Sequence, residues 1–573
     1  MQTPTSGSKI DNFIILLFND RLLMMLGALI VPLIVLSSTK ISENADPLIL
    51  YLIISLGFMA GLFVIQKSLS NPVIPYLLLQ MVLFFIFLDK KIMANSGLNL
   101  KLYADVFMIS STVAFYHLIK HFKYLWNTFP LFKYLFIYFV ITAFYLIFHY
   151  YSDFRLNNDV LSLRYAQTLK VGTKINSQVK REFGDMAQFV LYIDWLIPII
   201  CTTISLMLFK GLKTIKDIQS RFLTIIKYFT LILLIHFSLA SLTTVVGLND
   251  KFINVYGEND PGTNFFFTML LLVLLSFKYY ISNINFENDK EINFISKILT
   301  VTMLYDFILI IFNGIFSEGS SSMILALFLG LPILLFFNSR LGLSFPFFLS
   351  YTNSNFSALH KMNDAKKESL KQFLKTLLTV VVVGAVLGYF LFRMFSTYSS
   401  KTRSVGMRID HWKDAYYSWI AHLGFLKVLI GYGLDRLLEV VYYASNSSAI
   451  EQGIVSPHNM FLLMIYNQGL VSFLFFGAIL STVANSIKSL KDKTIDIGVK
   501  IFSSANIAII TSVFVLWFFV DMTLILRIIF FCIIGMIESV KHALNQCNKE
   551  LDSSTFISLP NSNLTSPNRV ETS

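Results

Sequence analysis

The sequence predicts an all-α, polytopic integral membrane protein with about fourteen transmembrane helices and one large external loop, carrying interfacial helices, before the last three spans. Hydrophobic residues occupy 55% of the 573 positions and charged residues only 14%, and the mean hydropathy is +0.66. Apolar runs of about 17 to 25 residues recur along the chain, which is the length that an α-helix needs to cross a bilayer. Because these runs are continuous rather than alternating, they exclude a membrane β-barrel.

The predicted spans follow the apolar runs in chain order. They cover 22–38, 48–65, 72–88, 102–119, 131–150, 189–209, 222–246, 264–282, 297–316, 321–337, 373–392, 459–486, 501–520 and 523–541. The first run lacks a small-residue cleavage site, so we expect no cleavable signal peptide. The regions are then N-terminal transmembrane helices (1–392), a large external loop (393–457), C-terminal transmembrane helices (458–545) and a disordered cytoplasmic tail (546–573) rich in Ser, Asn, Thr and Pro.

The distribution of Lys and Arg predicts the orientation. Basic connections near 120–133, 210–221, 339–372 and 487–500 alternate with connections poor in Lys and Arg, such as 39–47 and 247–263. Basic connections stay in the cytoplasm, so we expect both termini there and the segments 151–188 and 393–457 outside. The net charge of +12 is spread over many short loops, and we therefore expect no nucleic-acid partner.

The external loop contains a stretch whose helical spacing gathers cationic and aromatic side chains on one face. These are Arg408, His411, Trp412, Ala415, Tyr416 and Trp419. Such a helix lies along a membrane interface, where an arginine fork can donate two hydrogen bonds to a lipid phosphate. A plain interfacial helix anchored by its aromatic residues, with Arg408 extending to the headgroups, explains the same pattern.

Two further motifs follow in the loop and at its end. The Gly431-Tyr432-Gly433 turn permits a tight bend or a close approach of backbone to a ligand, and it has neither the spacing nor the Lys of a Walker loop. His458 and Asn459 open the next span, at the external boundary of the membrane. A neutral imidazole there can take a proton from a hydroxyl, and Asn459 can hold a sugar hydroxyl or orient the ring. A histidine that merely caps the helix is the alternative.

Metal, cofactor and disulfide sites are not indicated. No Cys, His and Asp residues have metal-ligand spacing around His411, His422 and His458. Cys201 and Cys532 fall inside spans, and no pair of cysteines lies in an external loop.

Taken in order, Arg408 and Trp412, the Gly431-Tyr432-Gly433 turn, and His458-Asn459 followed by Gly469 resemble the signature of the O-antigen ligase and polymerase superfamily. The resemblance covers roughly residues 300 to 540 and includes the late external loop followed by about three spans. It departs from the family at Ser317-Glu318-Gly319-Ser320, where an arginine is expected. Substitutes are available in the external loops: Arg155, Arg164, Arg181, Arg393 and Arg403.

The resemblance implies a metal-independent, inverting glycosyltransferase without cofactor, in the bacterial inner membrane with its active site facing the periplasm. The donor is a saccharide on undecaprenyl diphosphate, and the acceptor is lipid A-core (ligase) or a growing glycan (polymerase). His458 and Arg408 are the expected catalytic residues. Substrate binding is expected from Trp412, Asn459, Gly431, Gly433 and Arg403.

Other functions remain open at this point. Ligase is favoured slightly over polymerase because of the helix after His458-Asn459, which ends in Gly469-Leu470. A related protein O-oligosaccharyltransferase would use a Ser or Thr acceptor. A lipid-linked oligosaccharide flippase fits the number of spans, although such carriers usually show internal repeats and charges at the bilayer midplane. A scaffold subunit of a polysaccharide export machine would not need the Arg, Trp and His-Asn set.

Overall fold

The computed structural model describes residues 61–81, 98–153, 196–245, 261–283, 289–316, 321–343, 412–413, 428–429, 431, 459–518 and 524–557. These residues form helices and short connections and include no strand, which confirms the all-α fold class. Six of their helices are long and apolar enough to cross a membrane, and three shorter apolar helices accompany them. The structure thus supports a polytopic membrane protein. The number fourteen stays a prediction, since spans such as 22–38 and 373–392 lie outside the described residues.

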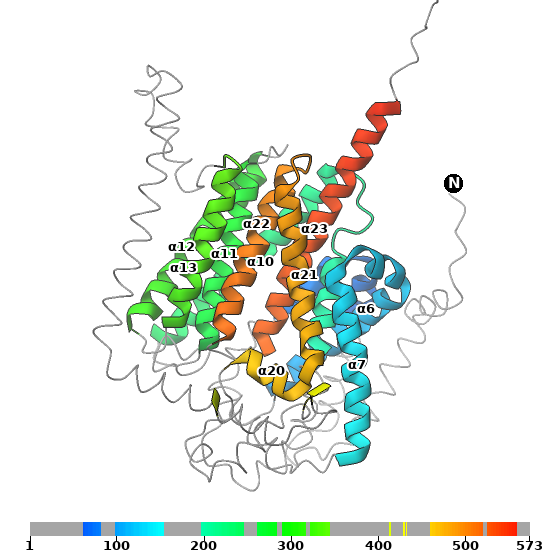
Figure 1. The fold of residues 1–573 in the computed structure, drawn as a ribbon. Coiled ribbons are helices and arrows are strands. Elements are labelled where there is room, and N and C mark those ends of the chain that lie inside the picture. Colours follow the sequence, from blue (N-terminus) through cyan, green and yellow to red (C-terminus); the bar gives the residue numbers. More distant parts are fainter. Residues whose placement is uncertain are drawn as a thin grey trace, which may run out of the picture.

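The described helices form one bundle (Figure 1). They are α4 (Val73–Gln80), α6 (Leu98–Thr128), α7 (Pro130–Asp153), a segment Leu196–Leu206, α10 (Ile215–Val245), α11 (Pro261–Asn283), α12 (Asp289–Phe316), α13 (Ser321–Arg340), α20 (Met460–Gln468), the 3-10 turn η3 (Gly469–Val471), α21 (Ser472–Lys491), α22 (Ile497–Trp517) and α23 (Leu524–Ile557). The ends of α11 and α21 and the starts of α12 and α22 lie at one end of the bundle, and α20 lies at the other (Figure 1).

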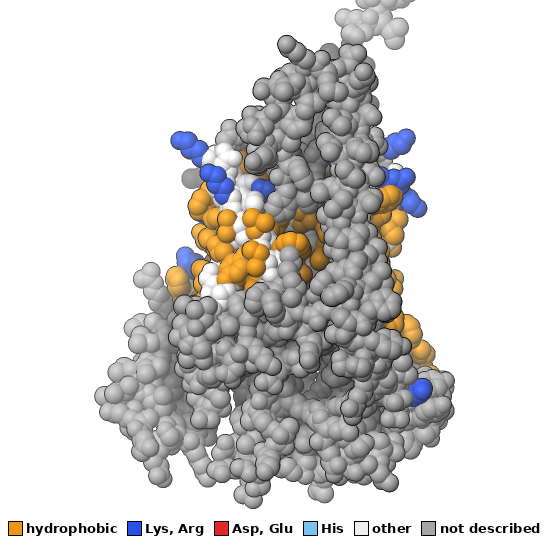
Figure 2. All heavy atoms as spheres, turned by 90° about the vertical axis from the view of Figure 1, so that its left-hand side faces the viewer, with side chains coloured by type: hydrophobic (Ala, Val, Ile, Leu, Met, Phe, Trp, Pro, Cys, Tyr) orange, Lys and Arg blue, Asp and Glu red, His pale blue; other side chains and the backbone are white. Residues whose placement is uncertain are grey.

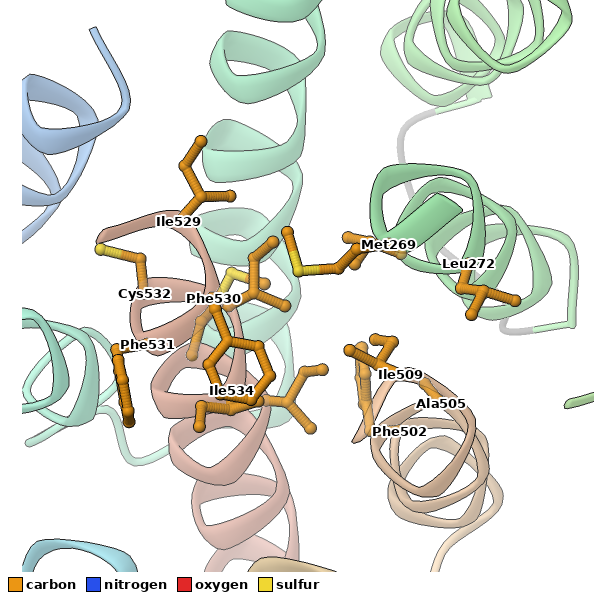
Figure 3. Packing of buried hydrophobic residues seen from close by; sticks show 14 of the residues in the cluster. Met269, Leu272, Phe502, Ala505, Ile509, Ile529, Phe530, Phe531, Cys532 and Ile534 are labelled. Atoms are coloured by element: carbon orange, nitrogen blue, oxygen red, sulfur yellow. The ribbon is translucent and has the colours of Figure 1, made fainter. Parts of the chain in front are cut away.

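Helix α22 is the centre of the bundle, because it packs against α11, α13, α21 and α23. It is apolar on nearly all sides, as expected for a helix surrounded by others. Figure 3 shows buried residues of this core from three helices: Phe502, Ala505 and Ile509 of α22, Met269 and Leu272 of α11, and Phe530 and Ile534 of α23. Trp517, at the end of α22, is fully buried among aromatic rings.

The outer surface of the bundle is apolar as well. Phe144 is 71% exposed, and Ile308 and Phe473 are also largely exposed. In Figure 2 such side chains form a band, with most of the visible Lys and Arg residues at its upper border. Exposure of so much apolar area to water is unfavourable by about 25 cal/mol per Å². Lipid chains are therefore the natural solvent for this band, as the composition predicts.

Two predicted boundaries differ from the structure. The run 459–486 was expected to be one span, but it is divided at Gly469 into α20, which has 9 residues, and the longer α21. At about 1.5 Å per residue, α20 is too short to cross a hydrocarbon core of about 30 Å. Helix α23 continues past position 545 to Ile557, so the first part of the expected tail is helical.

Candidate functional site

Asn459 begins the short helix α20 and is buried, with 4% of its surface exposed. Its backbone is extended (φ −145°, ψ 107°), and its side-chain oxygen accepts a hydrogen bond from the backbone N–H of Leu462 at 3.1 Å. This is the geometry of an N-cap, which satisfies one of the amides that a helix start leaves unpaired. The oxygen of Asn459 thus holds the helix start, and the amide nitrogen is the donor that this side chain offers to a ligand.

Gly469 ends α20 with a sharp change of direction. Its backbone (φ 56°, ψ −140°) lies in a region that residues with a Cβ rarely adopt. Ser472 then donates a hydrogen bond from its hydroxyl to the carbonyl of Gly469 at 2.6 Å, where α21 begins. Glycine is required here for its conformation, and also for space.

The space is limited by the segment that precedes the Gly431 turn. A Cβ at position 469 would lie 2.7 Å from the amide nitrogen of Gly431 and 2.9 Å from the carbonyl carbon of Leu429, and it would also collide with the carbonyl oxygen of Val428. All of these are backbone atoms, so no side-chain rotation can relieve the collision. The backbone of Gly469 is therefore in direct contact with the backbone of Val428, Leu429 and Gly431.

Gly431 itself is buried and has a positive φ of 73°, a conformation that favours glycine. Tyr432 and Gly433, the rest of the predicted turn, lie outside the described residues. The close approach that its glycine permits is made here to the chain's own Gly469. The structure therefore gives Gly431 a role in packing against Gly469. A role of Gly431 in substrate binding stays a prediction.

Helix α20 is held by neighbours on both of its sides. At its end, the hydroxyl of Tyr138 on α7 donates a 2.8 Å hydrogen bond to the side-chain oxygen of the buried Gln468. At its start, the ring of Phe461 packs against two other rings. Its centroid lies 5.0 Å from that of Phe476 and 4.8 Å from that of Phe518. Sequence reasoning missed Tyr138 and Gln468. A polar glutamine next to a glycine within an apolar run is the signal that could have identified them.

The remaining predicted site residues are only partly located. Trp412 lies in a helical position and is half-buried. His458, Arg408, Arg403 and Gly433 lie outside the described residues. The described part of the site consequently consists of the Asn459 cap, the Gly469 break and the buried Gly431 turn. Within the described ranges, no three His, Cys, Asp or Glu side chains gather as metal ligands would.

A second buried polar group connects α21, α22 and α23, and the sequence did not reveal it. Lys541 and Glu538, both on α23, form an ion pair of 2.7 Å in which neither side chain is more than 8% exposed. The ammonium group also donates to the hydroxyl of Ser486 at 2.9 Å. Asn506 donates to that hydroxyl at 3.1 Å and to the carboxylate of Glu538 at 3.2 Å. These hydrogen bonds offset part of the cost of burying two charges.

Comparison with known proteins gives no assignment, because no protein-family model and no curated protein matches this chain.

Proposed function

We propose that this chain is a membrane glycosyltransferase that moves a saccharide from undecaprenyl diphosphate to an acceptor sugar hydroxyl at the periplasmic face of a bacterial inner membrane. The acceptor we favour is lipid A-core, which makes the chain an O-antigen ligase. The alternative is an O-antigen or exopolysaccharide polymerase, in which the same donor is used and the acceptor is a growing glycan.

The observation that supports this proposal is the convergence of three motif positions. Gly431 was selected from one part of the sequence, and Asn459 and Gly469 from another, where they bound the same helix. Asn459 caps the helix that Gly469 ends, and the backbone of Gly469 touches that of Gly431. A glycine turn and a helix start held together in this way form a rigid corner. Rigid support of this kind is what a site needs if it is to orient a donor and an acceptor.

The proposed reaction is a single inverting displacement. The acceptor oxygen forms a bond to the anomeric carbon of the donor sugar while the bond from that carbon to the diphosphate oxygen breaks. The hydroxyl proton passes to the imidazole of His458, which directly precedes the Asn459 cap in the chain. The electron pair of the broken bond leaves with undecaprenyl diphosphate, whose growing charge is stabilised by Arg408 together with a second arginine such as Arg403.

The test is a reconstitution of the purified full chain with an undecaprenyl-diphosphate saccharide, with and without lipid A-core, followed by mass analysis of the products. We expect His458→Ala and Arg408→Ala to lower the rate at least about a hundredfold, the usual contribution of a positioned acid, base or charge. His422→Ala and Arg436→Ala are the matched controls, because they remove the same groups from the same loop. Full activity of either motif variant would exclude the proposed role of that residue.

The products separate the candidate functions. Saccharide joined to lipid A-core indicates a ligase. Longer undecaprenyl-linked chains formed without lipid A-core indicate a polymerase. If neither product forms while lipid-linked saccharide crosses the bilayer of a liposome, the chain is a flippase and the proposal is wrong.

Asn459 permits a finer test, because its amide donor can be removed while its capping oxygen is kept. Asn459→Asp keeps the capping oxygen and loses the amide donor, whereas Asn459→Ala loses both. We expect Asn459→Asp to retain the unfolding free energy of the wild type and to lower the rate, and Asn459→Ala to lower the unfolding free energy by about 1 kcal/mol as well. Equal rates for wild type and Asn459→Asp would exclude a role of the amide donor in the reaction.

A further inference from the structure

A groove of about 510 Å³ lies on the last part of α6, beside the connection to α7. Its lining residues are Lys120, His121, Lys123, Tyr124, Asn127 and Thr128. Helix α6 is bent at this point, because His121 has non-helical backbone angles (φ −121°, ψ 18°). The groove is separate from the candidate glycosyltransferase site. Tyr138, which meets Gln468 of that site, lies eight residues into α7, about 12 Å along the helix.

The lining side chains share one chemical property. Each of the six can donate a hydrogen bond, and none of them carries a carboxylate. A seventh donor comes from a different part of the chain. The ammonium group of Lys210 is hydrogen-bonded to Nδ1 of His121 and lies 5.0 Å from the centre of the Tyr124 ring.

The positively charged side chains in and beside this groove repel one another. Burial, and next the charge of Lys120, lower the pKa of Lys210 from its usual 10.5 to about 8. Among the described residues, the groups that interact with Lys210 are His117, His121, Tyr124 and Lys120, all on α6. Burial raises the pKa of Tyr124 to about 12, so its hydroxyl remains a neutral donor. An anion in the groove would compensate the crowded cations.

The position of the groove adjoins the surface that lipid chains would cover. Ile119, directly before Lys120, is 61% exposed. Trp126 follows on the same helix, with the ammonium group of Lys133 at 5.2 Å from its ring. An exposed apolar residue beside aromatic and cationic residues is typical of the boundary between hydrocarbon and headgroups. Basic pockets at this level bind anionic headgroups in other membrane proteins.

We propose that the groove lined by Lys120, His121, Lys123, Tyr124, Asn127 and Thr128 is a binding site for a phosphate group, carried by an anionic lipid or by a soluble phosphate compound. Lys120 and Lys123 supply the attraction from the exposed rim, and Lys210, hydrogen-bonded to the lining residue His121, adds a further positive charge beside the groove. The hydroxyl and amide groups of Thr128 and Asn127 are suited to the remaining phosphate oxygens.

The test compares two sources of phosphate on the purified full chain. One arm adds inorganic pyrophosphate to the chain in nanodiscs of phosphatidylcholine. The other arm replaces part of the phosphatidylcholine by phosphatidic acid. Bound ligand is measured by native mass spectrometry and by the shift in unfolding temperature. We expect Lys120→Gln combined with Lys123→Gln to weaken binding at least about tenfold, because each charged hydrogen bond to phosphate contributes about that much or more.

The control is Lys488→Gln combined with Lys491→Gln, which removes two exposed lysines from the end of α21 and leaves the groove intact. Binding of pyrophosphate that depends on Lys120 and Lys123 identifies a soluble phosphate compound as a ligand. Dependence seen only with phosphatidic acid identifies a lipid. No binding in either arm, or an equal loss in the control, overturns the proposal.

Discussion

The contact between Gly469 and the Gly431 turn predicts that Gly469→Ala is strongly destabilising. Two separate costs arise in the structure. The first is conformational, since φ 56° with ψ −140° is a backbone region that costs a residue with a Cβ about 1–3 kcal/mol. The second is steric, since the new Cβ would sit 2.7 Å and 2.9 Å from backbone atoms of Gly431 and Leu429. Forcing an extra methyl group into a packed site costs about 1–3 kcal/mol more.

Together these costs lower the unfolding free energy by about 2–6 kcal/mol. Substitutions at two other glycines measure the conformational and steric costs separately. Gly342 also has a positive φ, of 75°, but a Cβ there meets nothing within 4 Å. It follows the last turn of α13, where Leu343 donates to the carbonyl of Asn338 at 3.0 Å in a helix-ending motif that favours glycine. Gly342→Ala therefore carries the conformational cost alone, about 1–2 kcal/mol.

Gly477 provides the remaining comparison. It lies within α21 at an ordinary helical position, and a Cβ there has no neighbour within 4 Å. Gly477→Ala is expected to be neutral or to stabilise by about 0.5–1 kcal/mol, because alanine loses less backbone entropy in a helix.

The assay is reversible unfolding in mixed detergent micelles, with each variant measured under the same conditions. The expected order of unfolding free energy is Gly477→Ala highest, then Gly342→Ala, then Gly469→Ala. If Gly469→Ala costs no more than Gly342→Ala, then the backbone contact with the Gly431 turn is absent, and the observation that supports our proposed function is lost with it.

Three further results are expected. Lys541→Met should lower the unfolding free energy by about 3–5 kcal/mol, because it leaves the buried carboxylate of Glu538 unpaired. The double variant Lys541→Met with Glu538→Gln should recover most of this loss in the same unfolding assay. Sulfate binding to the groove around His121, measured by calorimetry from about pH 7 to about pH 9, should be strongest below pH 8 and should fall above it, since Lys210 loses its charge as the pH rises through its pKa of about 8. A pH-independent affinity would show that Lys210 does not face the anion. Gly330→Ala should destabilise the packing of α13 against α11 and α22. Its Cβ would collide with the hydroxyl of Ser512 and lie 2.7 Å from Leu272 of α11 and 3.1 Å from the carbonyl oxygen of Ala508 of α22. A Tm equal to that of Gly477→Ala would contradict this packing.

The helices were predictable because their signal is local. Long apolar runs such as 222–246 and 501–520 correspond to α10 and α22 within a few residues at most ends. The break at Gly469 was not predictable in the same way. Apolar residues continue on both sides of it, and the backbone that it contacts belongs to Val428, Leu429 and Gly431, which are distant in the chain.

The polar features show the same limit. The motif residues Gly431 and Asn459 could be selected from the sequence, but the capping role of Asn459 needed the geometry of Leu462. The basic connection 120–133 was recognised only as a signal of orientation. Its groove depends on the bend of α6 at His121, and the contact of His121 with Lys210, from another part of the chain, could not be read from the sequence. Averaged hydropathy likewise concealed Glu538 and Lys541 within an apolar run.

The ion pair on α23 has a consequence for how this chain enters its membrane. Glu538 and Lys541 are three residues apart and pair on a single helix, whereas α21 and α22 contribute only the neutral groups of Ser486 and Asn506. A helix whose opposite charges neutralise each other can leave the insertion machinery without waiting for a partner, because the cost of an isolated charge in hydrocarbon is avoided. Assembly with α21 and α22 can then follow as a later step within the bilayer. The three-residue spacing of Glu538 and Lys541 thus allows α23 to insert into the membrane before it packs against α21 and α22.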